Sequence, residues 1–135
     1  MPTSPVDAHT YWSELRDLVN TRRCWLRVAY TMDDVTEIGR WGQTLGIPVA
    51  NYLEGPSGPM RFADVLWVEV STQRLCGGLA GRPLESIDIR EDLIAAMSKT
   101  QLIWDVRRTT WSIDRLFADK AIDVVHVDAP PLTVS

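Results

Sequence analysis

The sequence predicts a single α+β domain in which a mixed β-sheet is packed by three to four helices. Three observations support this fold class. The chain has 135 residues, enough for one self-sufficient core. Its 45% hydrophobic and 24% charged residues have the balance of an ordered globular protein. Helix-like and strand-like hydrophobic patterns also alternate along it, and a ferredoxin-like split β-α-β arrangement is one specific case of such a fold.

We expect the folded domain to cover residues 7–128, with flexible ends at 1–6 and 129–135, where prolines gather. The chain opens with no basic or apolar run of the kind that begins a signal peptide, and no apolar stretch is long enough to cross a bilayer. Cys24 and Cys76 form no CxxC unit and are expected to be buried free thiols in a reducing compartment, with a single disulfide as the alternative. These features predict a cytoplasmic protein that works away from membranes.

The first part of the chain favours a helix over 8–22, where apolar residues recur at helical spacing, followed by a strand over 24–30. Thr31 is placed to cap a second helix, and an extended segment over 47–53 follows it. Residues 24–53 therefore predict a β-α-β unit. The inward side chains of its helix would be Val35, Ile38, Trp41 and Leu45.

The middle of the chain predicts, in order, a loop, a strand, a glycine-rich loop and a helix, at 54–59, 62–71, 76–83 and 89–99. A strand over 101–107 comes next. Ser112 is then placed to cap a helix with apolar residues on its inner side, and a closing strand covers 122–128. Residues 101–128 accordingly predict a second β-α-β unit.

Charge and motif content narrow the function. The formal net charge of −4 speaks against a protein that works by neutralising phosphates. No GxSxG, HExxH, P-loop or GxGxxG pattern is present, so we expect no cofactor. A zinc site would need nearly all of His9, His126, Cys24 and Cys76 to converge, and we expect no metal site. The sequence therefore favours binding over catalysis.

Six tryptophans are spread along the chain, and the second β-α-β segment holds the one locally basic and aromatic cluster. Trp and Arg dominate the binding energy of protein interfaces. We therefore predict a protein-binding surface formed by Trp104, Arg107, Arg108, Trp111 and Arg115. The alternative is that both tryptophans belong to the core and the arginines form a solvated strand end.

Two other functions stay open. Residues 31–55 have some features of a helix-turn-helix, although its second helix would carry no Arg or Lys and only Asn51 to read a base, so nucleic acid is not the expected partner. A small enzyme or ligand-binding domain is the other alternative. Its ligand would meet the glycine-rich loop, whose backbone N–H groups could bind an anion, at Cys76, Gly77, Gly78, Gly81 and Arg82.

The leading interpretation is a non-catalytic protein-interaction or assembly module of prokaryotic or phage origin, such as a regulatory, immunity-type or structural subunit. Its partner would be another protein or a second copy of the chain. Self-association is expected because a small sheet usually leaves an edge strand to cover.

Overall fold

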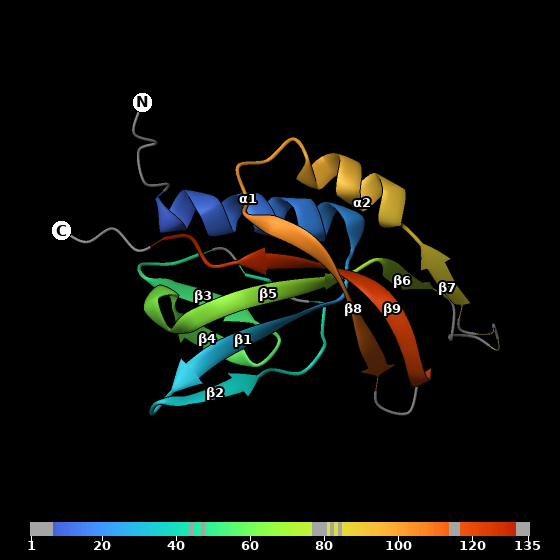
Figure 1. Cartoon of the computed structure of the whole chain (residues 1–135), viewed down its shortest axis with the longest axis horizontal. Helices are drawn as coiled ribbons and strands as arrows, with labels where there is room; N and C mark the ends of the chain where they lie inside the picture. The colour runs from blue at the N-terminus through green and yellow to red at the C-terminus, as the bar shows by residue number, and fades with distance from the viewer. Residues whose placement is uncertain are drawn as a thin grey trace.

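The computed structural model describes residues 7–43, 45–46, 48–76, 81, 83, 85–113 and 117–131. Its main feature is a five-stranded sheet in the order β2-β1-β5-β9-β8 (Figure 1). Every neighbouring pair in this sheet is antiparallel. The strands are β1 (Leu26–Met32), β2 (Val35–Ile38), β5 (Val65–Ser71), β8 (Trp104–Ile113) and β9 (Phe117–Asp128).

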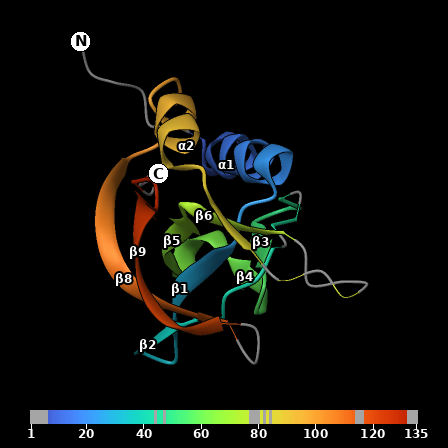
Figure 2. The ribbon, with the colours of Figure 1, turned by 90° about the vertical axis from the view of Figure 1, so that its right-hand side faces the viewer.

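The described chain has two α-helices, α1 (Ala8–Arg22) and α2 (Arg90–Met97), which lie on the same side of the sheet (Figures 1 and 2). The side chain of Asp7 caps α1 by accepting a hydrogen bond from the backbone N–H of Thr10, 3.1 Å away. Arg23 ends α1 in the left-handed region at φ 53°. These two elements confirm the helices expected at 8–22 and 89–99. Neither has the length and apolar character that crossing a membrane would require.

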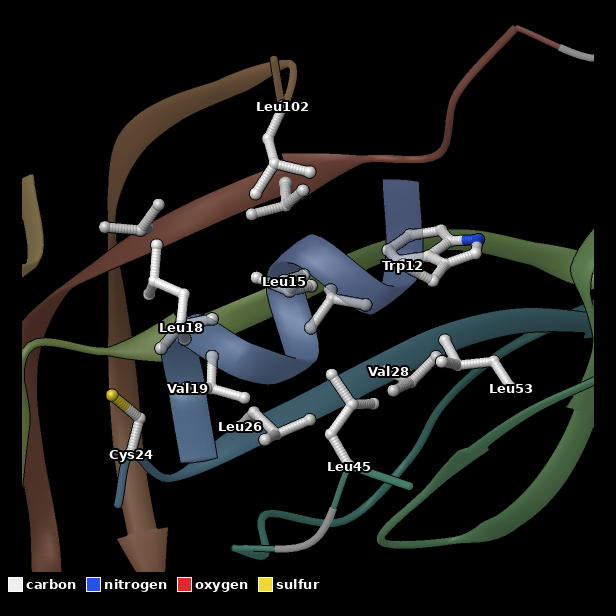
Figure 3. Close-up of a cluster of buried hydrophobic side chains, with 14 of the residues drawn as sticks. Trp12, Leu15, Leu18, Val19, Cys24, Leu26, Val28, Leu45, Leu53 and Leu102 are labelled. Atoms are coloured by element: carbon white, nitrogen blue, oxygen red, sulfur yellow. The ribbon is translucent and has the colours of Figure 1, made fainter. Parts of the chain in front are cut away.

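The main core lies between α1 and the sheet (Figure 3). One face of α1 is buried because its apolar residues recur every three or four positions. Alternate residues of β1, β5 and β9 face that helix. Burying each such side chain contributes about 1.5–3 kcal/mol. The buried residues that α1, β1, β5 and β9 contribute to the main core include Tyr11, Trp12, Leu15, Val19, Leu26, Val28, Val68, Val70, Val125 and Val127.

Two small hairpins flank the sheet. The first joins β3 (Tyr52–Gly55) to β4 (Gly58–Arg61) and packs against β1, and a 3₁₀ turn over Phe62–Asp64 leads from it into β5. Gly55 permits the close packing, because a Cβ atom there would lie 2.9 Å from Val28 Cγ2. The second hairpin joins β6 (Gln73–Cys76) to β7 (Glu85–Asp88).

The predicted mixed sheet with three to four packing helices is wrong, because the protein is mostly β. The helix expected after Thr31 is replaced by a β-hairpin, in which Met32 of β1 pairs with Val35 of β2. Asp33 and Asp34 make the two-residue turn, with φ 51° and 64°. Asp tolerates this left-handed backbone well, so the chain reverses where a helix cap was expected.

The second predicted β-α-β unit, 101–128, is also wrong. Instead of starting a helix, Ser112 lies within β8, which pairs along its length with β9 from Trp104↔Val127 to Ile113↔Phe117. β8 contains Val106, Thr109, Thr110 and Ile113, and β9 contains Ile122 and three valines; these β-branched residues fit a pleated surface better than a helix. A split β-α-β fold needs a helical crossover in each unit, and both expected crossover helices are strands, so the ferredoxin-like arrangement is wrong as well.

The helix-turn-helix considered as an alternative for 31–55 is not seen in the described part of that segment. The described part of this segment contains β2, β3 and irregular chain, and Asn51 lies in an exposed turn. The segment therefore offers no recognition helix to a DNA groove.

The sheet is strongly curved. Arg27 on β1 donates a hydrogen bond of 3.1 Å to Thr109 Oγ1 on β8, although β5 and β9 lie between these strands. In a flat sheet three strand spacings would separate β1 from β8 by about 14 Å. The sheet therefore curls around the face that carries Arg27, and Figure 2 shows β8 and β9 curving. We call this the concave face, and the helices cover the opposite one.

Candidate functional site

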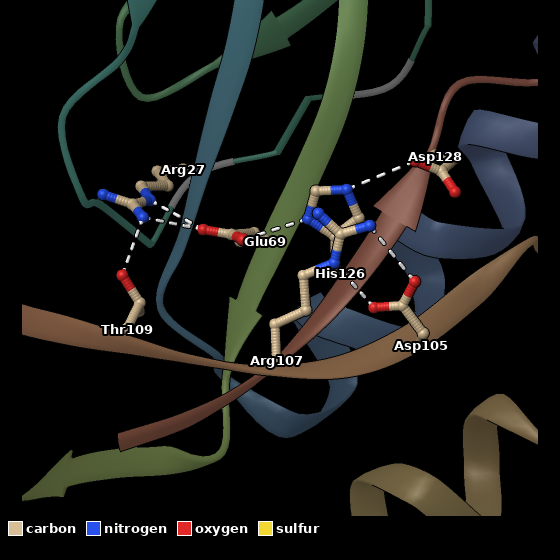
Figure 4. A network of polar contacts seen from close by, with 7 residues as sticks. All are labelled: Arg27, Glu69, Asp105, Arg107, Thr109, His126 and Asp128. Atoms are coloured by element: carbon tan, nitrogen blue, oxygen red, sulfur yellow. Dashed lines mark hydrogen bonds and ion pairs between the residues drawn. The ribbon is translucent and has the colours of Figure 1, made fainter. Parts of the chain in front are cut away.

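A row of polar side chains crosses four strands of the concave face (Figure 4). The strand register places Arg27 of β1, Glu69 of β5, His126 of β9 and Asp105 of β8 directly beside one another in turn. Cross-strand partners lie on the same face of a sheet. Four residues separated widely in sequence are thus brought into line by the register alone.

Glu69 is the centre of this row. Its Oε1 accepts hydrogen bonds from Arg27 Nε at 3.0 Å and Nη2 at 2.7 Å, and its Oε2 lies 3.0 Å from His126 Nδ1. The Glu69 side chain is only 7% exposed and that of Arg27 18%. A carboxylate this buried requires partners, and Glu69 has one on each oxygen.

His126 is almost completely buried between carboxylates and an aromatic ring. Its Nδ1 faces Glu69, its Nε2 lies 3.2 Å from Asp128 Oδ1, and its side chain is 2% exposed. The ring of Trp67 lies over it with centroids 4.9 Å apart. Because each ring nitrogen of His126 faces a carboxylate, this histidine–carboxylate chain links β5 to β9.

Tryptophans extend the polar row into a second apolar cluster. The guanidinium carbon of Arg27 lies 4.8 Å from the ring centroid of Trp41 and 5.8 Å from that of Trp67, distances at which cation–π attraction operates. The Trp41 ring meets Trp111 edge-on at 6.4 Å. Trp111 is fully buried and packs with Ile122 and Val124. The concave face therefore has a core of its own.

The predicted aromatic and arginine surface is divided by the structure. Trp104 is half-buried against the main core, whereas Trp111 belongs to the concave cluster. Arg107 and Arg108 are exposed, and Arg115 lies outside the described residues. The two exposed arginines already bind carboxylates, Asp105 at 2.9 Å and Asp123 at 3.1 Å. The hydrogen bonds from Arg107 lower the pKa of Asp105.

The glycine-rich loop can be placed only in part. Cys76 ends β6 and is half-buried, and Gly81 has the left-handed φ of 76° that favours glycine. Gly77, Gly78 and Arg82 lie outside the described residues. The described segments on either side of the loop, β6 and β7, pair with each other as antiparallel strands.

The four side chains considered for zinc do not form a cluster. Among the described residues, no three His, Cys, Asp or Glu side chains converge in a way that could hold a metal ion. His9 Nε2 lies 2.9 Å from the carbonyl oxygen of Pro48. Cys24 is buried in the main core, and this burial raises the pKa of its thiol to about 12.

The burial of Cys24 predicts a large difference in thiol reactivity. In the native protein at pH 8, Ellman's reagent should react with the half-buried Cys76 and leave Cys24 untouched, because only an accessible thiolate is nucleophilic. Two thiols should react in 6 M guanidinium. The Cys76→Ser variant should show no native reaction, and rapid native labelling of that variant would contradict the buried position of Cys24.

Exposed apolar side chains gather at the tip of the β1–β2 hairpin. A groove of about 600 Å³ runs between this hairpin and the β3–β4 hairpin. We call it the hairpin groove and define it by the lining residues Tyr30, Met32, Asp33, Asp34, Tyr52, Met60, Arg61 and Asp64. Met32 is 57% exposed and Tyr52 48%, and Val35, the cross-strand neighbour of Met32, is 57% exposed.

Sequence reasoning missed both the polar row and the hairpin groove. Glu69 did leave a signal, because it interrupts the most apolar stretch of the chain, at 65–70. The hairpin groove also left a signal in the sequence, because Asp33 and Asp34 directly follow a strand and aspartate is a typical turn residue. Comparison of the chain with protein-family models, with curated proteins and with solved structures found no match.

Proposed function

We propose that the chain is a non-catalytic protein-binding module that contacts its partner through the hairpin groove. The observation that carries this proposal is the gathering of exposed apolar side chains at one place. Met32 and Tyr52 are each about half exposed and line the groove, and the similarly exposed Val35 pairs with Met32 across the hairpin. Isolated exposed apolar residues are ordinary, but a contiguous group beside a groove is typical of an interaction site.

The edge of the sheet supports the same surface. Within the described residues β2 pairs with β1 alone, so the N–H and C=O groups along its other side are open. All four residues of β2 are exposed. An open edge strand beside apolar side chains suits a partner that adds a strand or a loop.

The hairpin groove has better support than the surface around Arg107 and Arg108. A binding hot spot needs an accessible aromatic anchor, and Trp111 is fully buried. The two arginines would also have to give up Asp105 and Asp123. An enzymatic role for the concave face has little support, because His126 is enclosed.

A matched pair of variants tests the surface. Alternation along β2 places Val35 on the groove side with Glu37, and Ile38 on the opposite face. We expect Met32→Thr/Val35→Thr to weaken binding to the natural partner by about tenfold or more, because interface anchors of this size contribute roughly 1–2 kcal/mol. Ile38→Thr removes an equally exposed side chain, at 54%, and should bind normally.

The immobilised wild-type chain would capture the partner from a lysate of the cells that naturally make the protein. The purified partner would then be titrated by calorimetry against the wild type and each variant. Binding that is lost in the groove variant and kept in Ile38→Thr supports the proposal. Equal binding by all three proteins would rule out the groove. If no purified protein binds the wild type, a second copy of the chain included, the protein-binding function itself is rejected.

A further inference from the structure

The residues that line the hairpin groove indicate which kind of side chain it would bind. Its walls are amphipathic: Tyr30 and Tyr52 supply aromatic rings, and Met32 and Met60 supply flexible apolar side chains. Its rim is acidic, with Asp33, Asp34 and Asp64. Long side chains with an apolar stem and a cationic head match both features, since the stem packs along the wall and the head reaches the carboxylates.

The charge of the rim is only partly balanced. Arg61 pairs with Asp64 at 2.9 Å, and the hydroxyl of Tyr30 donates to Glu37 at 2.9 Å. In the part of the chain that the structure describes, Asp33 and Asp34 have no hydrogen-bond or ion-pair partner for their carboxylates. Two adjacent, unpaired negative charges therefore stand at the mouth of an amphipathic groove on a protein whose net charge is −4.

The turn itself does not require these two charges. Both residues have positive φ, the geometry of a type I′ turn, for which Asn-Gly is the preferred sequence. Asp-Asp adds mutual repulsion between neighbouring carboxylates to a backbone that Asn-Gly would adopt more easily. The two charges are thus better explained by an interaction of the Asp33–Asp34 turn with a binding partner than by the stability of the hairpin.

We propose, resting on the function proposed above, that the partner is a protein with a cationic surface and that it inserts an arginine or lysine side chain into the hairpin groove. The cationic head lies against Asp33 and Asp34, and its stem packs between the tyrosine rings, where cation–π attraction adds to the ion pairs. The apolar residues around the groove give the contact its area, and the two aspartates select the charge of the partner.

The test uses a fluorescein-labelled nona-arginine peptide and fluorescence anisotropy at 50 mM salt. We expect Asp33→Asn/Asp34→Gly to bind this peptide roughly five- to tenfold more weakly than wild type, as the loss of two exposed ion pairs predicts. Its thermal midpoint should be equal or higher, because the turn becomes Asn-Gly. Raising the salt to 0.5 M should remove most of the difference.

The matched control is Glu85→Gln/Glu91→Gln, which removes the same charge from exposed positions on β7 and α2. It should bind nona-arginine as the wild type does. Equal weakening in both double variants would mean attraction to net charge alone and would overturn the inference. Failure of the wild type to bind the peptide would also overturn the inference. If the peptide failed to bind but Met32→Thr/Val35→Thr still lost the natural partner, the proposed protein-binding function would stand and only the cationic partner would be rejected.

Discussion

Replacement of Glu69 by alanine should lower the free energy of unfolding by about 3–5 kcal/mol, the cost expected when one member of a buried ion pair is removed. The loss is large because Glu69 serves two partners. Without it, Arg27 loses both hydrogen bonds to Oε1, and His126 loses the carboxylate at Nδ1. Both groups stay in place under Trp41 and Trp67, where little water can replace the carboxylate.

Two further variants separate the charge from the space it fills. Glu69→Gln keeps the volume and one acceptor oxygen, so its loss should be smaller than that of the alanine variant. Asp105→Ala removes a carboxylate that is 49% exposed and pairs with Arg107, and should cost less than about 1 kcal/mol. Urea unfolding followed by tryptophan fluorescence measures all three. A loss below 1 kcal/mol for Glu69→Ala would contradict the central role of this residue.

The sequence predicted α1 and α2 well because their signals are local. The apolar residues of α1 recur at helical spacing, Asp7 caps the first turn, and Arg23 can close the last. The helix expected at 89–99 likewise forms as Arg90–Met97. In both cases the residues that decide the structure lie within one or two turns of one another.

The strands that were mistaken for helices depend on distant partners. Val35 and Ile38 are three residues apart, a spacing that suits a helix face, yet they form an exposed edge strand paired with β1. Ser112 had a favourable sequence context for a cap, but β8 gains its hydrogen bonds from β9 across the hairpin. The local preference of a segment for helix is outweighed when the same residues can pair along the length of a neighbouring strand.

The polar row illustrates the same limit. Glu69 could be noticed as a charge within an apolar strand, but nothing near it in sequence indicates that Arg27 and His126 are its partners. Those contacts arise from the register of β1, β5 and β9, and a shift of one residue would turn Glu69 to the helix-covered face. A lone charge in an apolar strand is a signal of a buried polar contact, but only the fold identifies the partners of Glu69.

Trp111→Ala should lower the free energy of unfolding by about 3–5 kcal/mol, as large-to-small changes at fully buried aromatic positions do. The ring is 0% exposed, packs with Ile122 and Val124, and meets the edge of Trp41. Removing it opens a void in the concave cluster and leaves Trp41 without support above Arg27. The damage should therefore reach the polar row as well.

The neighbouring strand position provides the control, because Thr110 is exposed on the other face of β8 and Thr110→Ala should change stability by less than about 0.5 kcal/mol. Trp111→Phe keeps an aromatic ring against Trp41 and should fall between the two. If Trp111 were instead an interface anchor, Trp111→Ala would keep the stability of the wild type and lose only partner binding. Urea unfolding of the isolated chain distinguishes these outcomes, since a core residue changes the unfolding midpoint when no partner is present.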